Sequence, residues 1–318
     1  MTTFKKHRYL LATTDPVHIG TGGYRLGRVD NSIVREPGTR IPKIPGTSLH
    51  GAIRSYAAKI YEDPQAAGQD QTNAIITPDK NPICYTFGYI QSGDNNERAF
   101  SGVVNIFDAV IFLFPVHSMS GPVWVTTSQR LQEAGITIND GLDQWADDTV
   151  LTTFTRTDAL NLGWIMLEVS RKVTVSLPDN VDWGTTSQWR AIQDRLVLVK
   201  PYLFSQIVNS NLEIRTSVSI EPKTGAAKSG ALFTYEALPR STFLTMDIVL
   251  DDYREGESER PFPVKETAQK NRMPNGDWTG PEDVVQAGLN MLAWLGVGGM
   301  GTRGFGRLMK VGSTQSLE

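Results

Sequence analysis

Apolar runs of strand length recur along the chain, and turn-rich stretches separate them. The first run, YLLATT at residues 9–14, is β-prone and leads into the segment DPVHIGTGG. The run VVNIFDAVIFLF at residues 103–114 is the most strand-like in the chain, and residues 242–250 and 305–311 also have strand character. The pattern therefore predicts strands near both ends of the chain and in its middle.

Three segments have helical spacing instead. Apolar residues recur with helical periodicity over residues 48–61, where Thr47 or Ser48 can act as the N-cap. Another helix is predicted to begin at Pro281, because proline suits the first helical position, and to end at a run of glycines. Residues 128–141 also show a helical pattern.

The other segments are insertions and a hairpin. Residues 211–238 form two β-rich arms around a Pro/Lys/Gly tip, which indicates a long hairpin that can project. Residues 62–101 are rich in Gln, Asn, Asp, Gly and Pro and are predicted to be a surface insertion. Residues 131–200 mix short strand signals with tryptophans, and we predict an insertion of unknown topology there.

The order of these elements indicates the fold class. A strand, a long loop, a helix and a strand near the start are matched by a strand, a helix and a strand at the end. This order predicts an α+β, ferredoxin-like unit with large insertions: an antiparallel sheet with at least two helices on one face and the 211–238 hairpin projecting.

Composition agrees with a folded protein. Of 318 residues, 40% are hydrophobic and 20% are charged, so the chain can bury a substantial core. Its only cysteine, Cys84, excludes an intrachain disulfide, and its four histidines lack zinc-type spacing. Residues 109–129 carry no charge, but prolines and polar residues interrupt them, so we predict two buried strands rather than a membrane span. We expect a cytoplasmic protein with no membrane association.

Charge is unevenly distributed along the chain. Residues 1–60 hold ten Lys/Arg against three acidic residues, whereas residues 131–190 hold four Lys/Arg against nine Asp/Glu. A polyanion could bind the basic part, although solvation of an ordinary surface explains the same counts.

Two loops are rich in glycine, the residue type typical of phosphate-binding turns. Residues 296–307 contain the spacing G-x-G-x-x-G, but a helix precedes them and a strand follows, the reverse of a dinucleotide-binding turn. Their backbone N–H groups could still approach phosphates, with Arg303 and Arg307 adding charge; the alternative is a flexible connector. The loop at residues 18–25 lacks the G-K-[ST] ending of a phosphate-binding NTPase loop, which argues against ATP hydrolysis.

Several motifs together resemble one family. They are PVHIGTG at 16–22, VDNSIVRE at 29–36, IPKIPGTSLHGAIR at 41–54, FDAVIFLFPV at 107–116 and GGMGTRGFGR at 298–307. In this order they resemble the RAMP superfamily of CRISPR-associated proteins, specifically the repeated backbone subunit of type III effector complexes. The FDAVIFLFPV run favours the type III-B (Cmr) form.

This resemblance implies a fold and partners. The expected fold is a single RAMP domain over residues 1–318, modified from the RNA-recognition motif, whose copies stack into a filament along one guide RNA. In each copy residues 211–238 form a thumb hairpin that disrupts the guide–target duplex at regular intervals, and a nearby acidic residue cleaves the target RNA. The implied partners are guide RNA, target RNA, further copies of the chain and other subunits of the complex.

The resemblance also implies site residues. Asp30 in VDNSIVRE corresponds to the catalytic acid, and Lys43, Ser48 and Arg54 correspond to positions that contact the guide backbone. His50 stands where relatives often have Lys, and His117 where Arg is common. The implied contacts of the glycine loop come from Gly298, Gly299, Gly301, Thr302, Arg303 and Arg307.

The chemistry can also be considered from the residues alone. In-line attack by a 2′-hydroxyl needs an aligned phosphate, a base or hydrated metal, and cations. Asp30, between Arg28 and Arg35, could anchor hydrated Mg²⁺ or another divalent ion or orient the strand, or it could simply accept hydrogen bonds within its loop. His18 could act as acid or base, or could support the glycine loop. Two functions remain open: a metal-dependent endoribonuclease, and an RNA-binding scaffold that does not cut.

Overall fold

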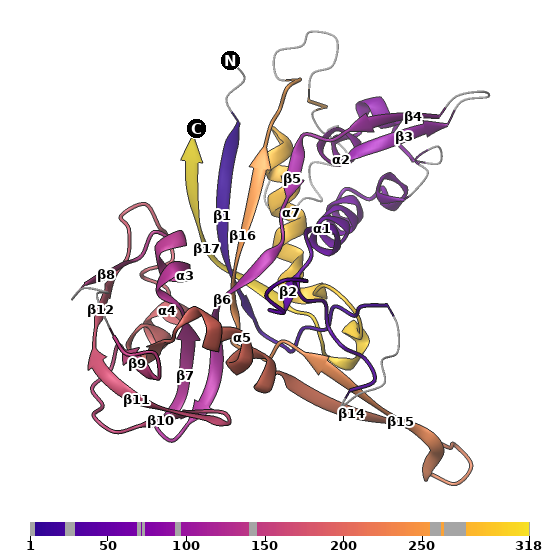
Figure 1. Cartoon of the computed structure of the whole chain (residues 1–318). Coiled ribbons are helices and arrows are strands. Elements are labelled where there is room, and N and C mark those ends of the chain that lie inside the picture. The colour runs from indigo at the N-terminus through magenta and orange to yellow at the C-terminus, as the bar shows by residue number, and fades with distance from the viewer. Residues whose placement is uncertain are drawn as a thin grey trace.

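One large sheet organises the chain (Figure 1). The computed structural model describes residues 4–22, 29–68, 71, 74–92, 97–139, 145–254, 262–263 and 278–317. The eleven strands of the sheet are β1 (Lys5–Thr13), β2 (Lys43–Ile44), β5 (Val104–Ile106), β6 (Ala109–Ser118), β7 (Gly121–Thr126), β9 (Thr149–Thr152), β10 (Leu160–Leu162), β11 (Ile165–Lys172), β13 (Leu196–Leu198), β16 (Phe243–Leu250) and β17 (Leu308–Leu317). Their main order is β10-β11-β9-β13-β7-β6-β16-β1-β17, with β2 beside β6 and β5 beside β16.

The central part of this sheet has the connectivity expected from the sequence. Strands β17, β1, β16 and β6 lie side by side and pair antiparallel. Helix α1 (Gly46–Ile60) follows β1 in the chain, and helix α7 (Pro281–Leu295) follows β16. This arrangement is consistent with a ferredoxin-like unit within a larger mixed α/β fold.

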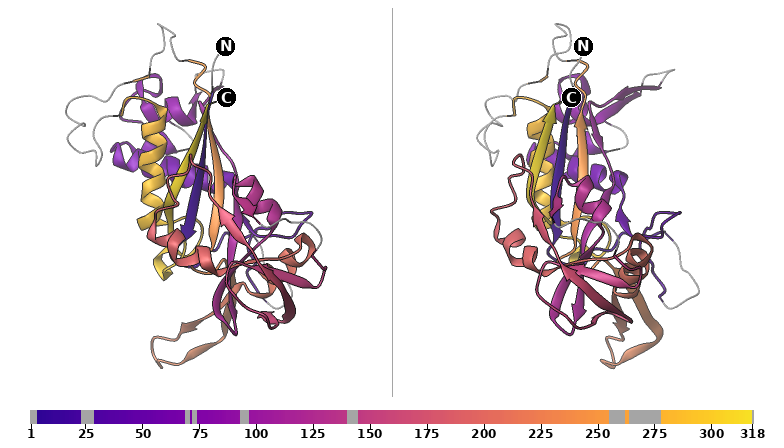
Figure 2. Two further views of the ribbon diagram at one scale, coloured as in Figure 1. Left: turned by 90° about the vertical axis from the view of Figure 1, so that its left-hand side faces the viewer. Right: turned by 60° about the vertical axis from the view of Figure 1, so that its left-hand side comes forward.

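Helices α1 and α7 pack together on one face of the central strands (Figure 2). Their backbones approach closely at Gly288, where an added β-carbon would lie 2.2 Å from the carbonyl oxygen of Ile53. The helix predicted at residues 48–61 is α1, which begins at Gly46 and ends at Ile60. Pro281 is the first residue of α7, as predicted. None of the described helices is long and apolar enough to cross a membrane.

The run at the start of the chain is apolar at consecutive positions because β1 is buried on both faces. Tyr9 and Leu11 belong to the core under α1 and α7. Leu10 and Ala12 belong to a second core on the opposite face, which also contains Trp183. Two cores on one sheet explain why this strand lacks the alternation typical of a sheet with one solvated face.

The second core lies under the segment whose topology the sequence did not predict. Parallel pairs, β9 with β11 and β7 with β13, extend the sheet there. The helix predicted at 128–141 ends early because Gly135 has φ +77° and residues 137–139 form a strand. The further elements of this part are α3 (Ser128–Glu133), β8 (Thr137–Asn139), β12 (Thr174–Ser176), α4 (Ser187–Ile192), the 3₁₀ turn η3 (Gln193–Arg195) and α5 (Pro201–Ser210).

The segment 62–101 contains more structure than a surface loop. Its elements are the 3₁₀ turns η1 (Pro64–Ala67) and η2 (Pro78–Lys80), the helix α2 (Pro82–Phe87), and a small hairpin of β3 (Gly88–Ser92) and β4 (Glu97–Ser101). Every residue of α2 is buried, and Asn81 caps its N-terminus. The sequence did not predict this helix, because six residues in a polar segment are too few to show a helical period.

The hairpin predicted at 211–238 is confirmed. Its strands β14 (Glu213–Ile220) and β15 (Ala227–Ala237) pair antiparallel and project from the body (Figure 1). The strand-like run at 103–114 is instead two strands, β5 and β6, separated at Phe107 and Asp108. This break exposes Phe107 and turns Asp108 toward the start of α1.

Candidate nucleic-acid interface

Asp30 lies at the base of the thumb hairpin and is bonded directly to it. The Thr234 backbone N–H and hydroxyl both donate to Asp30 Oδ2, at 2.8 and 3.0 Å, and the Asp30 N–H donates to Thr234 Oγ1 at 3.0 Å. These hydrogen bonds, first from the backbone and then from the side chain of Thr234, hold the pKa of Asp30 below its ordinary value. The carboxylate is therefore ionised at neutral pH.

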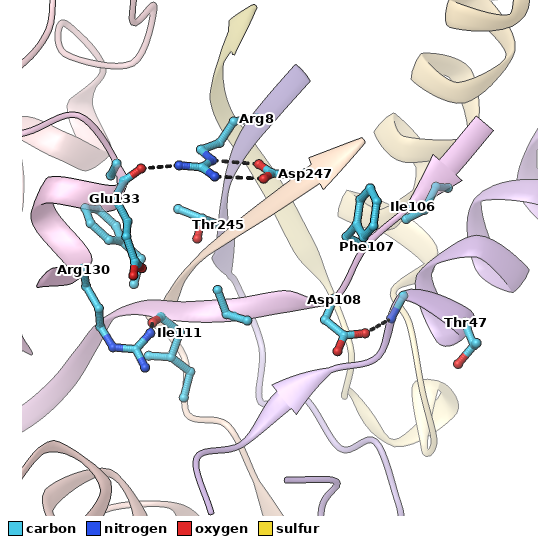
Figure 3. A pocket seen from close by; sticks show the side chains of 14 residues that line it. Arg8, Thr47, Ile106, Phe107, Asp108, Ile111, Arg130, Glu133, Thr245 and Asp247 are labelled. Atoms are coloured by element: carbon cyan, nitrogen blue, oxygen red, sulfur yellow. Dashed lines mark hydrogen bonds and ion pairs between the residues drawn. The ribbon is translucent and has the colours of Figure 1, made fainter. Parts of the chain in front are cut away.

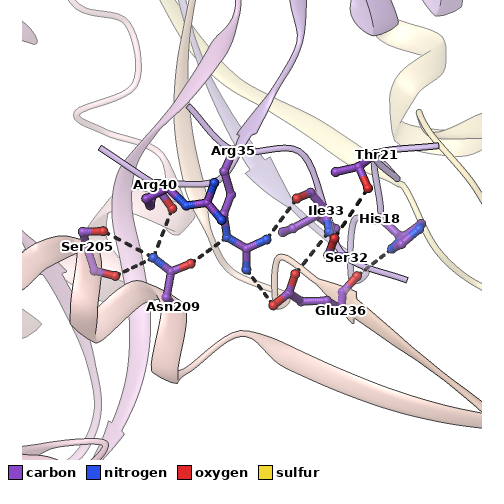
Figure 4. Close-up of polar contacts among 9 residues, drawn as sticks. All are labelled: His18, Thr21, Ser32, Ile33, Arg35, Arg40, Ser205, Asn209 and Glu236. Carbon is purple, nitrogen blue, oxygen red and sulfur yellow. Dashed lines mark hydrogen bonds and ion pairs between the residues drawn. The ribbon is translucent and has the colours of Figure 1, made fainter. Parts of the chain in front are cut away.

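A polar network fixes the base of the hairpin to the loop that carries Asp30 (Figure 4). Glu236 accepts hydrogen bonds from the Arg35 guanidinium at 2.6 Å and from the Ile33 N–H at 3.1 Å. Arg35 also donates to Asn209 of α5 at 2.8 Å. Arg35, which the sequence analysis placed beside Asp30, therefore holds the hairpin base through Glu236. Arg28 lies outside the described residues.

His18 lies beneath the glycine loop rather than at an open surface. It is 6% exposed, and its Nδ1 is 2.6 Å from the carbonyl oxygen of Glu236, so Nδ1 must donate. The carbonyl of His18 accepts the N–H of Gly299 at 2.9 Å. At Gly298, with φ +89°, an added β-carbon would lie 2.5 Å from that same carbonyl oxygen. This placement favours support of the loop; the acid–base role remains a prediction.

The glycine loop contacts the hairpin through Arg303. The 3₁₀ turn η4 (Gly301–Arg303) is exposed, including Thr302. Arg303 donates to the Tyr235 hydroxyl at 2.7 Å and lies over the Phe233 ring. Arg307 forms an ion pair with Asp15 at the surface. Both arginines are exposed, and each already bonds to another residue of the chain. Their RNA contacts remain predictions.

The guide-contact positions of the 41–54 motif separate into two environments. Lys43 forms an ion pair with Asp108 at 2.5 Å, and Ser48 lies nearby in the first turn of α1. His50 packs edge-to-face on the Phe87 ring, and Arg54 donates to the Ala66 carbonyl at 2.9 Å. Burial lowers the pKa of both inner side chains, and Arg54 lowers that of His50 further.

A cavity of about 520 Å³ opens beside Asp108, the ion-pair partner of Lys43, on the side of the sheet away from α7 (Figure 3). The start of α1 forms one wall, where the Gly46 N–H donates to Asp108 at 2.7 Å. Opposite, Arg8 pairs through two nitrogens with Asp247, at 2.7 and 2.8 Å. Burial raises the pKa of Asp247, but the bonds and charge of Arg8 outweigh it, and the net pKa is lowered.

Carboxylates in the described residues do not gather into a metal-binding cluster. No group of three or more His, Cys, Asp or Glu is placed there to hold an ion. Asp30 offers one carboxylate, and Thr234 already occupies its Oδ2. One carboxylate fits a Mg²⁺ ion that takes its other ligands from water and RNA phosphate, because Mg²⁺ usually keeps several waters.

Several residues of this interface were not identified from the sequence. Thr234 and Glu236 reach partners that are about two hundred positions away in the chain, so no local spacing marks them. Asp108 was visible only as a break in an apolar run, and Arg8 only as one cation in a basic segment. Alternation along β15 was the one available signal, since it places Thr234 and Glu236 on the same face.

Comparison with known proteins defines the class. The profile of the RAMP superfamily matches residues 10–309, and the chain belongs to this family. A curated relative from Pyrococcus furiosus, named CRISPR system Cmr endoribonuclease Cmr4, is 24% identical over 246 residues, which cover 73% of this chain and 77% of the relative. The Csm3 endoribonuclease of Enterococcus italicus is 47% identical over 45 residues, which cover 14% and 21%.

Solved structures share the fold over nearly the whole chain. A type III-B Cmr-beta structure in the apo state aligns with a TM-score of 0.57 at 15% identity, covering 98% of this chain and 96% of the other. Oligomeric Cmr4 from Pyrococcus furiosus aligns with a TM-score of 0.52 at 17% identity, covering 100% and 99%. The expected RAMP fold is thereby confirmed.

Proposed function

We propose that this chain is a guide-RNA-binding backbone subunit of a type III-B CRISPR interference complex and that it cleaves guide-paired target RNA at Asp30. The observation that carries the proposal is the direct bonding of Asp30 to the projecting thumb hairpin. Relatives named as Cmr and Csm endoribonucleases support RNA cleavage. A Cmr-beta structure bound to cognate target RNA and an oligomeric Cmr4 support the proposed partners, which are target RNA and further copies. We place the complex in the cytoplasm.

In the proposed reaction the 2′-oxygen of the target attacks the adjacent phosphorus, and the bond from phosphorus to the 5′-oxygen breaks. The 2′-hydroxyl loses its proton to water, and the departing 5′-oxygen takes up a proton, so the products are a 2′,3′-cyclic phosphate and a 5′-hydroxyl. Efficient general bases have pKa values near the working pH, and the pKa of Asp30 is shifted the other way. Asp30 therefore suits orientation of the 2′-hydroxyl or of a hydrated ion better than proton removal.

A divalent ion would be held by Asp30, water and RNA phosphate, and when bound it would supply a charge that stabilises the pentavalent phosphorane. On the protein side, exposed Arg303 supplies a cation where it bonds to Tyr235 of the hairpin, and exposed Arg307 supplies a second one from the same glycine loop. Guide recognition is assigned to Lys43, Ser48 and the cavity at the start of α1. Phosphate contacts of this kind are indifferent to sequence, which leaves base edges free to pair.

The test uses the assembled complex and end-labelled target RNA, with and without EDTA. Asp30→Asn keeps an oxygen for the Thr234 donors but removes the charge, so we expect cleavage to fall at least about 100-fold while target binding is retained. Asp79→Ala, in an exposed turn away from the hairpin, is the control and should cut like wild type. Undiminished cutting by Asp30→Asn would favour the non-cleaving scaffold, and loss only in His18→Gln would move the chemistry to His18.

A further inference from the structure

We infer that Thr234 is a positioning residue that sets the orientation of the Asp30 carboxylate, so that the thumb hairpin and the cleaving acid form one unit. The inference rests on the proposed function of Asp30. It adds a residue of the hairpin itself to the machinery of cleavage. Thr234 is half-buried and lies in β15, on the strand that faces the loop carrying Asp30.

The contacts between the two residues are reciprocal. The Thr234 hydroxyl accepts the Asp30 N–H at 3.0 Å and donates its own proton to Asp30 Oδ2 at 3.0 Å. Its backbone N–H donates to the same oxygen at 2.8 Å. In the described part of the chain no residue is seen to donate to Oδ1. Two donors on one oxygen restrict rotation of the carboxylate and leave Oδ1 available to RNA or a hydrated ion.

The backbone is held independently of the hydroxyl. The N–H of Asn31 donates to the Thr234 carbonyl at 3.1 Å, and the N–H of Glu236 donates to the Asn31 carbonyl at 3.0 Å, which adds a short parallel bridge to β15. Removal of the Thr234 hydroxyl therefore leaves the loop attached and changes mainly the orientation of the carboxylate. This separation makes the role of the hydroxyl testable without unfolding the site.

A side-chain hydroxyl is what this role requires. A hydroxyl can donate and accept at once, which a valine of nearly the same shape cannot do, while serine keeps the hydroxyl. The residue directly opposite in the hairpin, Thr216, provides a matched control because it is exposed and pairs with Thr234 in the strand register. The same Thr→Val change can thus be made on each side of one cross-strand pair.

The experiment measures single-turnover cleavage and target affinity of the assembled complex for Thr234→Val, Thr234→Ser, Thr216→Val and Asp30→Asn. We expect Thr234→Val to slow cleavage by about 10–100-fold, the size found when an orienting partner of a functional ligand is removed, with target affinity within about twofold of wild type. Thr234→Ser should recover most of the rate, and Thr216→Val should match wild type.

Each result has a defined meaning. Wild-type cleavage by Thr234→Val, or a loss that Thr216→Val shows equally, would overturn the inference while a defective Asp30→Asn still supported the proposed function. Loss of target affinity in Thr234→Val together with the rate would also overturn it, because that result indicates a structural role. If Asp30→Asn cuts normally, the proposed function fails first and the inference fails with it.

Discussion

Glu236 anchors the thumb hairpin, and replacing it by Gln tests how strongly. The side chains of Glu236 and Arg35 are 9% and 14% exposed, and the two carboxylate oxygens accept from Arg35 and from the Ile33 N–H. Glutamine keeps the shape but replaces one acceptor oxygen with an NH₂ group. That group must face one of the two donors, so at least one hydrogen bond is lost whichever way the amide turns.

The magnitude follows from these contacts. Losing one partner of a buried ion pair costs about 3–5 kcal/mol. Arg35 keeps its bonds to Asn209 and to the Ile33 carbonyl, so we expect the free energy of unfolding to fall by about 2–4 kcal/mol. With an unfolding entropy of about 2.1 cal/mol/K per residue over 318 residues, Tm should fall by about 3–6 °C.

Calorimetry of the purified protein measures this difference, with Glu213→Gln as the matched control. Glu213 pairs with Arg215 at 2.5 Å on the same hairpin, but their side chains are 27% and 46% exposed. An exposed pair contributes at most about 1 kcal/mol. The reasoning is refuted if Glu236→Gln lowers Tm no more than Glu213→Gln does.

Two further predictions concern guide binding and pH. Lys43→Ala should weaken binding of all guide RNAs alike and reduce the slope of log affinity against log salt by about 0.7. Filter-binding titrations measure both quantities, with Lys80→Ala at an exposed position as the control. Losses that depend on guide sequence would contradict a phosphate contact. Burial lowers the pKa of His50 from its ordinary 6.5, so this residue stabilises the fold above pH 6.5 and the contribution is lost as pH falls toward the folded-state pKa. His50→Gln should therefore flatten the fall of Tm below pH 6.5, and an unchanged fall would assign it to other groups.

Local sequence patterns correctly predicted the elements that local backbone preferences determine. The β14–β15 hairpin and the start of α7 at Pro281 followed from turn chemistry and the fixed φ of proline. Helix α2 escaped because six buried residues in a polar segment give no period to detect. The two cores on opposite faces of β1 became visible only when strands distant in the chain were paired.

The residues of the candidate site also fall into those that the sequence identified and those that it did not. Asp30 and the glycine loop carry motifs, so resemblance identified them, whereas Thr234 and Glu236 matter through partners far away in the chain. Composition counted Arg35 and Arg54 as available cations. The structure gives both of them internal acceptors, because a buried guanidinium needs hydrogen bonds that a count of charges does not reveal.

The position of β1 in the sheet has a consequence for synthesis on the ribosome. Strands β6, β7, β9, β10, β11 and β13 all come from residues 109–198, and these can pair soon after they emerge. Strand β1 is made first, yet its neighbours are residues 243–250 and 308–317. Its apolar segment therefore stays unpaired while the residues up to its partner strands are synthesised. Pairing across so long a loop is also slow. A nascent chain of this protein should need protection at its first strand until its last one is made.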